Sequence, residues 1–95
     1  MYAYGFLEIT GVTAAMTSMD IMGKTSAVEL VSWERKWGGM LVTIIIKGDI
    51  AAVNEAIEAA KANGIKEVKV SGVLANPHPE VVRMVNLSAQ RLRRL

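Results

Sequence analysis

The sequence predicts an α+β fold, an antiparallel sheet in the order β-α-β-β-α-β with an added C-terminal helix. Strand-like and helix-like stretches alternate along the chain. Residues 40–47 are apolar on both faces, as expected of a central strand covered on each side. The length of 95 residues suits one domain, which we expect to span residues 1–95.

The first half of the chain predicts a strand, a helix and two further strands. Residues 2–9 read as a strand that Thr10 and Gly11 end, and 27–33 and 40–47 read as the next two. Between them, apolar residues recur at helical spacing, with Gly23 ending the stripe and Lys24 at the negative end of the helix dipole. This predicted stripe consists of Val12, Ala15, Met16, Met19 and Met22.

The second half predicts a helix, a strand and a last helix. Asp49 suits the N-cap of an alanine-rich helix over 50–63, and Gly64 is placed to be its C′ residue. Residues 65–74 read as the fourth strand, and Pro79 suits the first position of the last helix. We expect that helix to pack through Val81, Val82, Met84, Val85 and Leu92. The order matches the ferredoxin-like, split β-α-β arrangement.

Composition excludes several classes of function. The longest apolar run, 40–46, is far shorter than the ~20 residues of a membrane span, and no basic start typical of a signal peptide is present. Three of the 11 cations lie in the last five residues, so the body lacks the basic face expected of a nucleic-acid-binding protein. Without cysteine, and with His78 as the single histidine, we expect no metal site and no cofactor. Because 52% of the residues are apolar, we expect the chain to self-associate and so bury apolar surface that a small single domain would expose.

No catalytic constellation can be assembled from these residues. No serine lies in a nucleophile-elbow context, and the glycines at 38 and 39 precede a strand, unlike those of a phosphate-binding loop. His78, between two prolines, is interpreted as a surface cap or an interface residue. The C-terminal RLRRL has two readings: a solvated helix end that suits the dipole, or a site for an acidic partner or phosphate backbone.

Three stretches resemble one known family in the same order. GFLEITGVTAAMTSMDIMGKTSAVELV resembles its opening strand, first helix and the lysine that ends it; LVTIIIKGDIAAVNEAIEAA resembles its central strand and second helix; NPHPEV resembles its entry to the last helix. On these motifs, over roughly residues 3–87, the chain is similar to the hexameric, single-domain shell proteins of bacterial microcompartments.

The resemblance implies a homohexamer that tiles with other shell proteins around encapsulated enzymes, in the bacterial cytoplasm. In this family the loop between the second and third strands lines a central pore. The expected lining is therefore Arg35, Lys36, Trp37, Gly38 and Gly39, where the two glycines let six backbones converge. A ring of these cations would favour small anionic metabolites; the alternative keeps the cations on the face of the hexamer, away from the axis.

The resemblance also implies a hexamer–hexamer edge at Lys24, Asn76, Pro77 and His78; without the resemblance, Lys24 would be interpreted as an ordinary helix-end lysine. Two features depart from the family. The pore loop is about one residue longer and carries Trp37, and Asn76 stands where many members have an arginine. Two alternatives to a structural role stay open at the level of sequence. One is a small oligomeric regulatory module that binds a metabolite, and the other is an acid–base enzyme that uses His78.

Overall fold

The computed structural model describes residues 2–35 and 40–93. Within them lie four strands and three helices, in the predicted order. The strands are β1 (Tyr2–Thr10), β2 (Val28–Arg35), β3 (Leu41–Asp49) and β4 (Val68–Ala75), and the helices are α1 (Val12–Thr25), α2 (Ile50–Asn63) and α3 (Pro79–Arg93). The strands form one antiparallel sheet in the order β2-β3-β1-β4, which confirms the predicted fold class.

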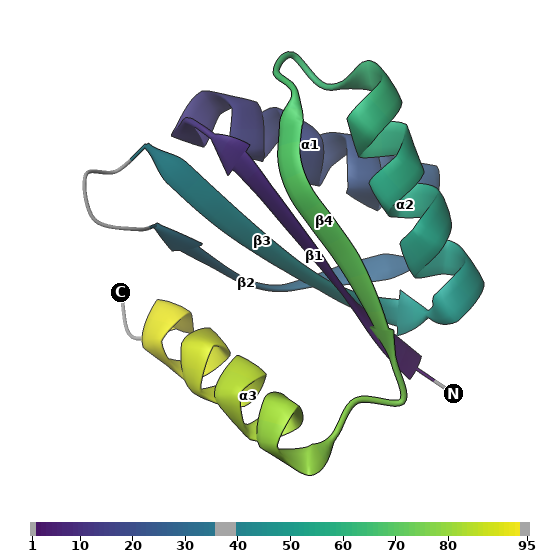
Figure 1. Ribbon diagram of the computed structural model, residues 1–95, viewed down its shortest axis with the longest axis vertical. Helices are drawn as coiled ribbons and strands as arrows, with labels where there is room; N and C mark the ends of the chain where they lie inside the picture. The colour runs from purple at the N-terminus through teal and green to yellow at the C-terminus, as the bar shows by residue number, and fades with distance from the viewer. Residues whose placement is uncertain (1, 36–39, 94–95) are drawn as a thin grey trace.

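Two layers of helix enclose the sheet unequally. Figure 1 shows α1 and α2 on one side and α3 alone on the other. The larger core lies under α1 and α2, where Leu7, Ile9, Val42, Ile44 and Ile46 of the central strands pack against alanine-rich helix faces. The smaller core lies under α3 and contains Tyr4, Ile45 and Val85. β3 therefore buries side chains on both faces, as its apolar run predicts.

Two glycines allow close or unusual backbone geometry. At Gly5 of β1, an added Cβ would lie 2.7 Å from Cγ1 of Val53 and 2.8 Å from Cγ1 of Ile46, so α2 packs directly on the backbone there. Gly11 joins β1 to α1 with φ of 96°, a conformation that L side chains rarely adopt. At both positions the backbone adopts a geometry that glycine allows and that a residue with a side chain would disfavour.

The helix ends differ from the sequence-based prediction in detail. α1 continues through Gly23 to Thr25, so Lys24 lies inside its last turn. Asp49 is the N-cap of α2, but its side chain makes no capping hydrogen bond. Gly64 is the C-cap with extended backbone rather than a left-handed C′ residue, and its N–H donates to the carbonyl of Ala60. The fourth strand begins at Val68, three residues later than predicted.

The predicted apolar faces of α1 and α3 are partly wrong. In α1 the buried side chains are Ala14, Ala15, Ser18 and Met22, whereas Met16 is 61% exposed. Small residues face α2 because the two helices pack against each other, and hydropathy alone does not identify that face. In α3, Val81, Val82 and Val85 join the smaller core, but Met84 is 63% exposed.

Candidate functional site

The end of β2 carries the first residue of the predicted pore lining. Arg35 is the last residue of β2, is exposed, and places its guanidinium carbon 5.9 Å from the centre of the Trp33 ring. The two side chains lie on the same side of the strand because residues two apart share a face. Lys36, Trp37, Gly38 and Gly39 lie outside the described residues.

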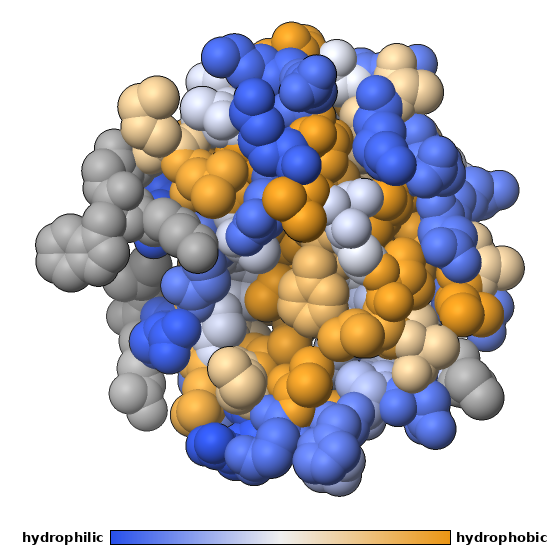
Figure 2. Space-filling view, viewed as in Figure 1, coloured by the Kyte–Doolittle hydropathy of each residue, from blue (hydrophilic) through white to orange (hydrophobic). Residues whose placement is uncertain are grey.

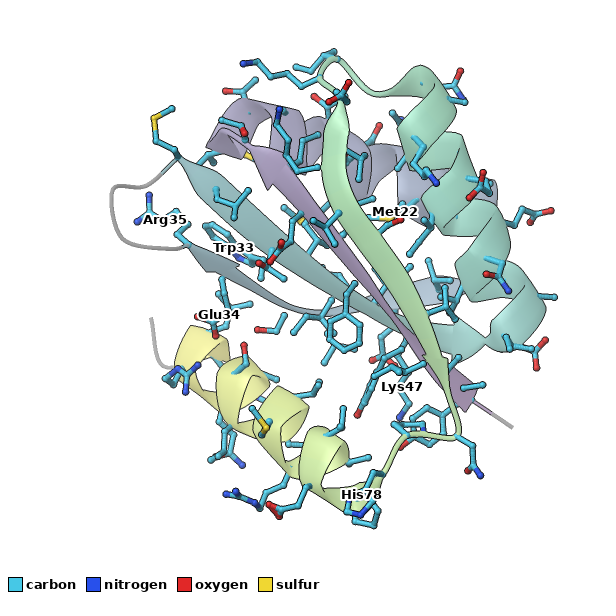
Figure 3. The ribbon with its side chains drawn as sticks, in the orientation of Figure 1. Met22, Trp33, Glu34, Arg35, Lys47 and His78 are labelled. Carbon is cyan, nitrogen blue, oxygen red and sulfur yellow. The ribbon has the colours of Figure 1, made fainter. Side chains whose placement is uncertain are left out.

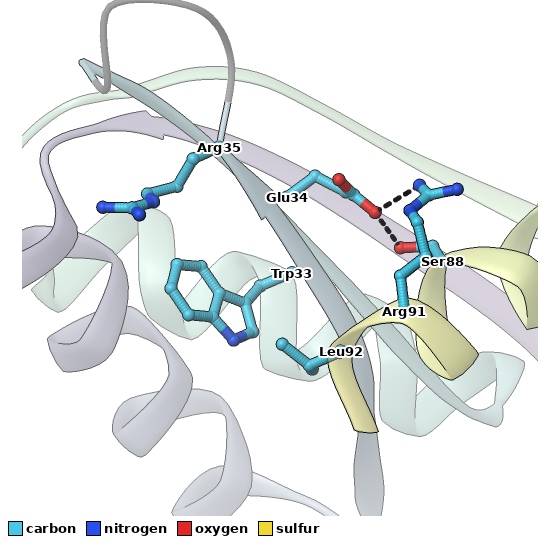
Figure 4. A pocket seen from close by; sticks show the side chains of 6 residues that line it. All are labelled: Trp33, Glu34, Arg35, Ser88, Arg91 and Leu92. Atoms are coloured by element: carbon cyan, nitrogen blue, oxygen red, sulfur yellow. Dashed lines mark hydrogen bonds and ion pairs between the residues drawn. The ribbon is translucent and has the colours of Figure 1, made fainter. Parts of the chain in front are cut away.

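Glu34, next to Arg35 in β2, forms hydrogen bonds with two side chains of α3. Its Oε2 accepts hydrogen bonds from the hydroxyl of Ser88 and, at 2.8 Å, from the guanidinium of Arg91 (Figure 4). The Ser88 hydrogen bond has the largest effect and lowers the pKa of Glu34, burial opposes it, and the Arg91 hydrogen bond and charge lower the pKa further. Glu34 is therefore ionised, and its negative charge, next to the predicted pore loop in the sequence, is neutralised by the ion pair with Arg91.

A buried pair of hydroxyls extends this network to the sheet. The Oγ atoms of Ser32 and Ser88 lie 2.6 Å apart, and both residues are buried. We refer to Ser32, Glu34, Ser88 and Arg91 as the α3 clamp. The sequence analysis predicted no such network, and it left the RLRRL segment that contains Arg91 as either a solvated helix end or a binding site. The available signal was a pair of serines at otherwise apolar positions.

The clamp borders a small pocket at the edge of the sheet. Trp33, Glu34, Arg35, Ser88, Arg91 and Leu92 line a volume of about 270 Å³ (Figure 4). Trp33 and Arg35 lie on the opposite side of β2 from Glu34. The pocket therefore combines the aromatic ring of Trp33 with the guanidinium of Arg35, which forms no ion pair among the described residues.

The predicted edge residues divide between two elements. Lys24, in the last turn of α1, has a side chain that is 77% exposed and pairs with Asp20 at 2.9 Å. Asn76, Pro77 and His78 connect β4 to α3, on the other side of the sheet from α1. Within the described part of the chain, no hydrogen bond or ion pair joins Lys24 to these three residues.

Asn76 and His78 shape the entry to α3. Asn76 has φ of 51°, in the left-handed region that asparagine tolerates better than most residues, and its N–H donates to the carbonyl of Tyr2 at 3.1 Å. The Nδ1 of His78 accepts a hydrogen bond from the N–H of Glu80 at 3.0 Å, and its carbonyl accepts from Val81 and Val82. The exposed His78 (Figure 3) thus caps α3, which confirms its interpretation as a surface cap.

Two features of the structure bear on other classes of function. Among residues 2–35 and 40–93, no three histidine, aspartate or glutamate side chains gather as a metal site would require. No helix within the same ranges is long and apolar enough to cross a membrane.

Comparisons with known proteins identify a family. The family model of the BMC domain matches residues 3–79 of this sequence. The chain is 41% identical over 85 residues to the bacterial microcompartment shell protein PduA of Citrobacter freundii, which covers 87% of this chain and 90% of PduA. It is 33% identical over 90 residues to the shell protein EutM of Salmonella typhimurium, covering 93% of each.

A carboxysome protein and a solved structure agree. The carboxysome shell protein CsoS1A of Hydrogenovibrio crunogenus is 36% identical over 83 residues, which is 83% of this chain and 84% of CsoS1A. A crystal structure of a microcompartment protein from Desulfitobacterium hafniense superposes with a TM-score of 0.78 and 26% identity over 93% of this chain. The chain spans about half the length of that solved protein, 48%. The chain therefore belongs to the BMC domain family, to which the shell proteins PduA and EutM are also related.

Proposed function

We propose that this chain is a structural tile of a bacterial microcompartment shell, assembling as a cyclic homohexamer that packs edge to edge with other shell proteins around encapsulated enzymes. The observation that carries the proposal is the family match over residues 3–79, together with relatives named as shell proteins over nearly the whole chain. In this proposal residues 1–95 form one shell domain without a catalytic role, in the bacterial cytoplasm.

An open apolar surface supports assembly. α3 packs against β2 and leaves the β4 edge of the same sheet face exposed, where apolar side chains gather (Figure 2). Val70 and Leu74 of β4 lie opposite Glu8 and Tyr4 in register, so they share this face, and they are 59% and 44% exposed. Together with Phe6 and the exposed Met84 we call them the open sheet patch. Such a patch favours burial against another copy.

The charges at the end of β2 support an anion-selective pore lined by Arg35, Lys36, Trp37, Gly38 and Gly39. The negative charge of Glu34 is already neutralised by Arg91, whereas no described ion pair neutralises Arg35. Six copies would therefore give a net positive collar. Two such charges ~10 Å apart in water repel by only ~0.4 kcal/mol, so a solvated ring of them is tolerated.

Lys24, Asn76, Pro77 and His78 are proposed to form the hexamer–hexamer edge. All except Pro77 are exposed, and Asn76 replaces the multidentate arginine of many relatives with a short amide. Lateral packing by this chain should therefore be weaker than packing through arginine. Electron microscopy of the wild type and of Asn76→Arg tests this, with more extensive sheets expected for the variant. Equal or smaller sheets from Asn76→Arg would contradict the edge role.

The native mass of the purified protein tests the assembly. Six copies of the 10.3 kDa chain give a particle of about 62 kDa. Sedimentation or light scattering at low protein concentration and moderate salt should show this mass. A dimer or trimer that persists on concentration would instead favour the small regulatory module, and the pore would have to be abandoned.

Single-channel recording on assembled sheets tests the pore. Lys36→Glu reverses one charge per copy and should shift the preference from anions to cations. Lys66→Glu makes the same change on an exposed residue between α2 and β4, and should leave the preference unchanged. An anion preference that survives Lys36→Glu would remove the proposed collar.

A further inference from the structure

A second polar pocket lies on the α3 side of the sheet, two rows of residues away from Glu34. Tyr4 of β1 and Glu29 of β2 are each directly opposite Lys47 of β3 in register. Side chains opposite one another in antiparallel strands lie on the same face. Because Tyr4 packs with Val85 in the core under α3, this whole row faces α3. Figure 3 shows Lys47 near the end of β3.

α3 completes the pocket from above. Asn86, Ala89 and Arg93 are spaced by three and four residues, so they share one face of the helix. With Tyr4, Glu29 and Lys47 they line a pocket of about 210 Å³. Ala89 lies between Asn86 and Arg93 on this helix face, and its small side chain is buried.

The charges in this pocket do not cancel. Lys47 and Arg93 contribute two positive charges, and Glu29 contributes one negative charge. Among the described residues, none of the three takes part in an ion pair. The ammonium of half-buried Lys47 instead lies 4.5 Å from the centre of the Tyr2 ring. The pocket therefore retains a net positive charge at a partly desolvated position.

The neutral groups add donors to those of the cations. Tyr4 is only 2% exposed, and burial, followed by the neighbouring Tyr2, raises the pKa of its phenol, so the hydroxyl keeps its proton. Asn86 offers an amide with two N–H donors, and the guanidinium of Arg93 offers a planar set that matches an oxyanion. One pocket thus brings together an ammonium, a guanidinium, an amide and a phenol.

We propose that this pocket binds a small oxyanion, either a phosphate group or the carboxylate of a short organic acid, between Lys47 and Arg93, with Asn86 and Tyr4 as neutral donors. Glu29 competes with the ligand for the same cations. The site joins α3 to the sheet at a second place, separate from the α3 clamp. It also assigns one arginine of the RLRRL tail to ligand binding, while Arg91 is used by the clamp.

Equilibrium dialysis of the assembled protein against inorganic phosphate, at low ionic strength, tests the site. We expect saturable binding of one phosphate per chain. Lys47→Gln and Arg93→Gln should each weaken it about tenfold or more, since each removes a charge-assisted hydrogen bond to the anion. Glu29→Gln should tighten binding by removing the competing carboxylate. Lys66→Gln, an exposed control with the same loss of charge, should bind as the wild type does.

Acetate, added as competitor, distinguishes the two ligand classes. Displacement of phosphate by acetate at similar concentrations indicates a carboxylate site, and failure to displace it indicates a phosphate site. Absence of saturable binding of either anion would overturn the proposal, as would equal weakening by Lys66→Gln and Lys47→Gln. Arg93 is exposed, so its variant keeps the test valid should Lys47→Gln fail to fold. The native mass of each sample separates loss of the site from loss of assembly.

Discussion

At the residue scale, the α3 clamp shows how two serines set the position of a helix. Ser32 is completely buried in β2, and its hydroxyl is satisfied by Ser88 across the boundary between sheet and helix. Ser88 in turn donates to Glu34, which also receives Arg91. A chain of polar groups in a mostly apolar contact fixes one arrangement, because any displacement leaves a buried hydroxyl without a partner.

Loss of one hydroxyl should cost more than loss of both. Ser88→Ala leaves Ser32 buried without its partner and should lower the free energy of unfolding by about 1–3 kcal/mol. The double variant Ser32→Ala/Ser88→Ala should recover part of this loss, since no unpaired hydroxyl remains. Urea denaturation of the four proteins in the cycle measures both effects. Additive losses would show that the two hydroxyls are not coupled.

The same clamp predicts a pH dependence of stability. The folded-state pKa of Glu34 is lowered, first by the Ser88 hydrogen bond, so ionised Glu34 stabilises the folded chain. This contribution is complete above the unfolded pKa of about 4.5 and is lost as pH falls through the lower folded value. Glu34→Gln should therefore flatten the fall in unfolding free energy below that pH.

A matched substitution distinguishes the clamp from ordinary surface charge. Glu80 pairs with Arg83 on exposed α3 positions, where such pairs contribute little. Urea denaturation at several acidic pH values should give Glu80→Gln the profile of the wild type. If Glu34→Gln also kept that profile, Glu34 would not stabilise the fold through its charge.

At the element scale, β1 and α2 depend on a missing side chain. Gly5→Ala would place a Cβ within 3 Å of Val53 and Ile46 and should lower the unfolding free energy by about 1–3 kcal/mol. Gly72 of β4 offers the control, since nothing lies within 4 Å of a Cβ added there. Gly72→Ala should be neutral or slightly stabilising. Thermal unfolding of both variants checks this, and equal losses would contradict the close packing of α2.

α3 is the element on which the proposals converge. The family model ends at residue 79, where α3 begins, so the helix lies almost wholly beyond the matched region. It packs on β2, borders the predicted pore loop through Glu34, and lines the proposed oxyanion pocket through Asn86 and Arg93.

At the scale of the whole molecule, the open sheet patch should decide the assembly state. Leu74→Glu places a charge in an apolar surface that we propose to be covered by another copy, and should reduce the native mass. Ile65→Glu changes an exposed apolar residue between α2 and β4, outside the sheet, and should not. Light scattering of both variants measures the outcome. An unchanged mass for Leu74→Glu would show that this face stays free in the assembly.

Sequence alone determined the α+β class, the order of elements and the family. Each of these depends on patterns a few residues long: the doubly apolar run of β3, the helical spacing before Lys24, and short motifs in a fixed order. Local patterns left His78 as a surface cap or an interface residue, and the structure shows the capping contact, which is formed by neighbouring residues. The proposed pore and edge residues are expectations from the resemblance to this family.

Tertiary structure decided which distant residues meet. The clamp joins residues 54 to 57 positions apart, and Lys47 and Arg93 line one pocket only because α3 docks over the sheet. The docking angle of a helix and the register of a sheet set these contacts, and neither leaves a periodic signal in the sequence. The same reason explains the face of α1, where helix packing selects small Ala14 and Ser18 over apolar Met16. The periodicity of apolar residues therefore predicts the helices and strands, whereas tertiary packing decides which distant residues form a site.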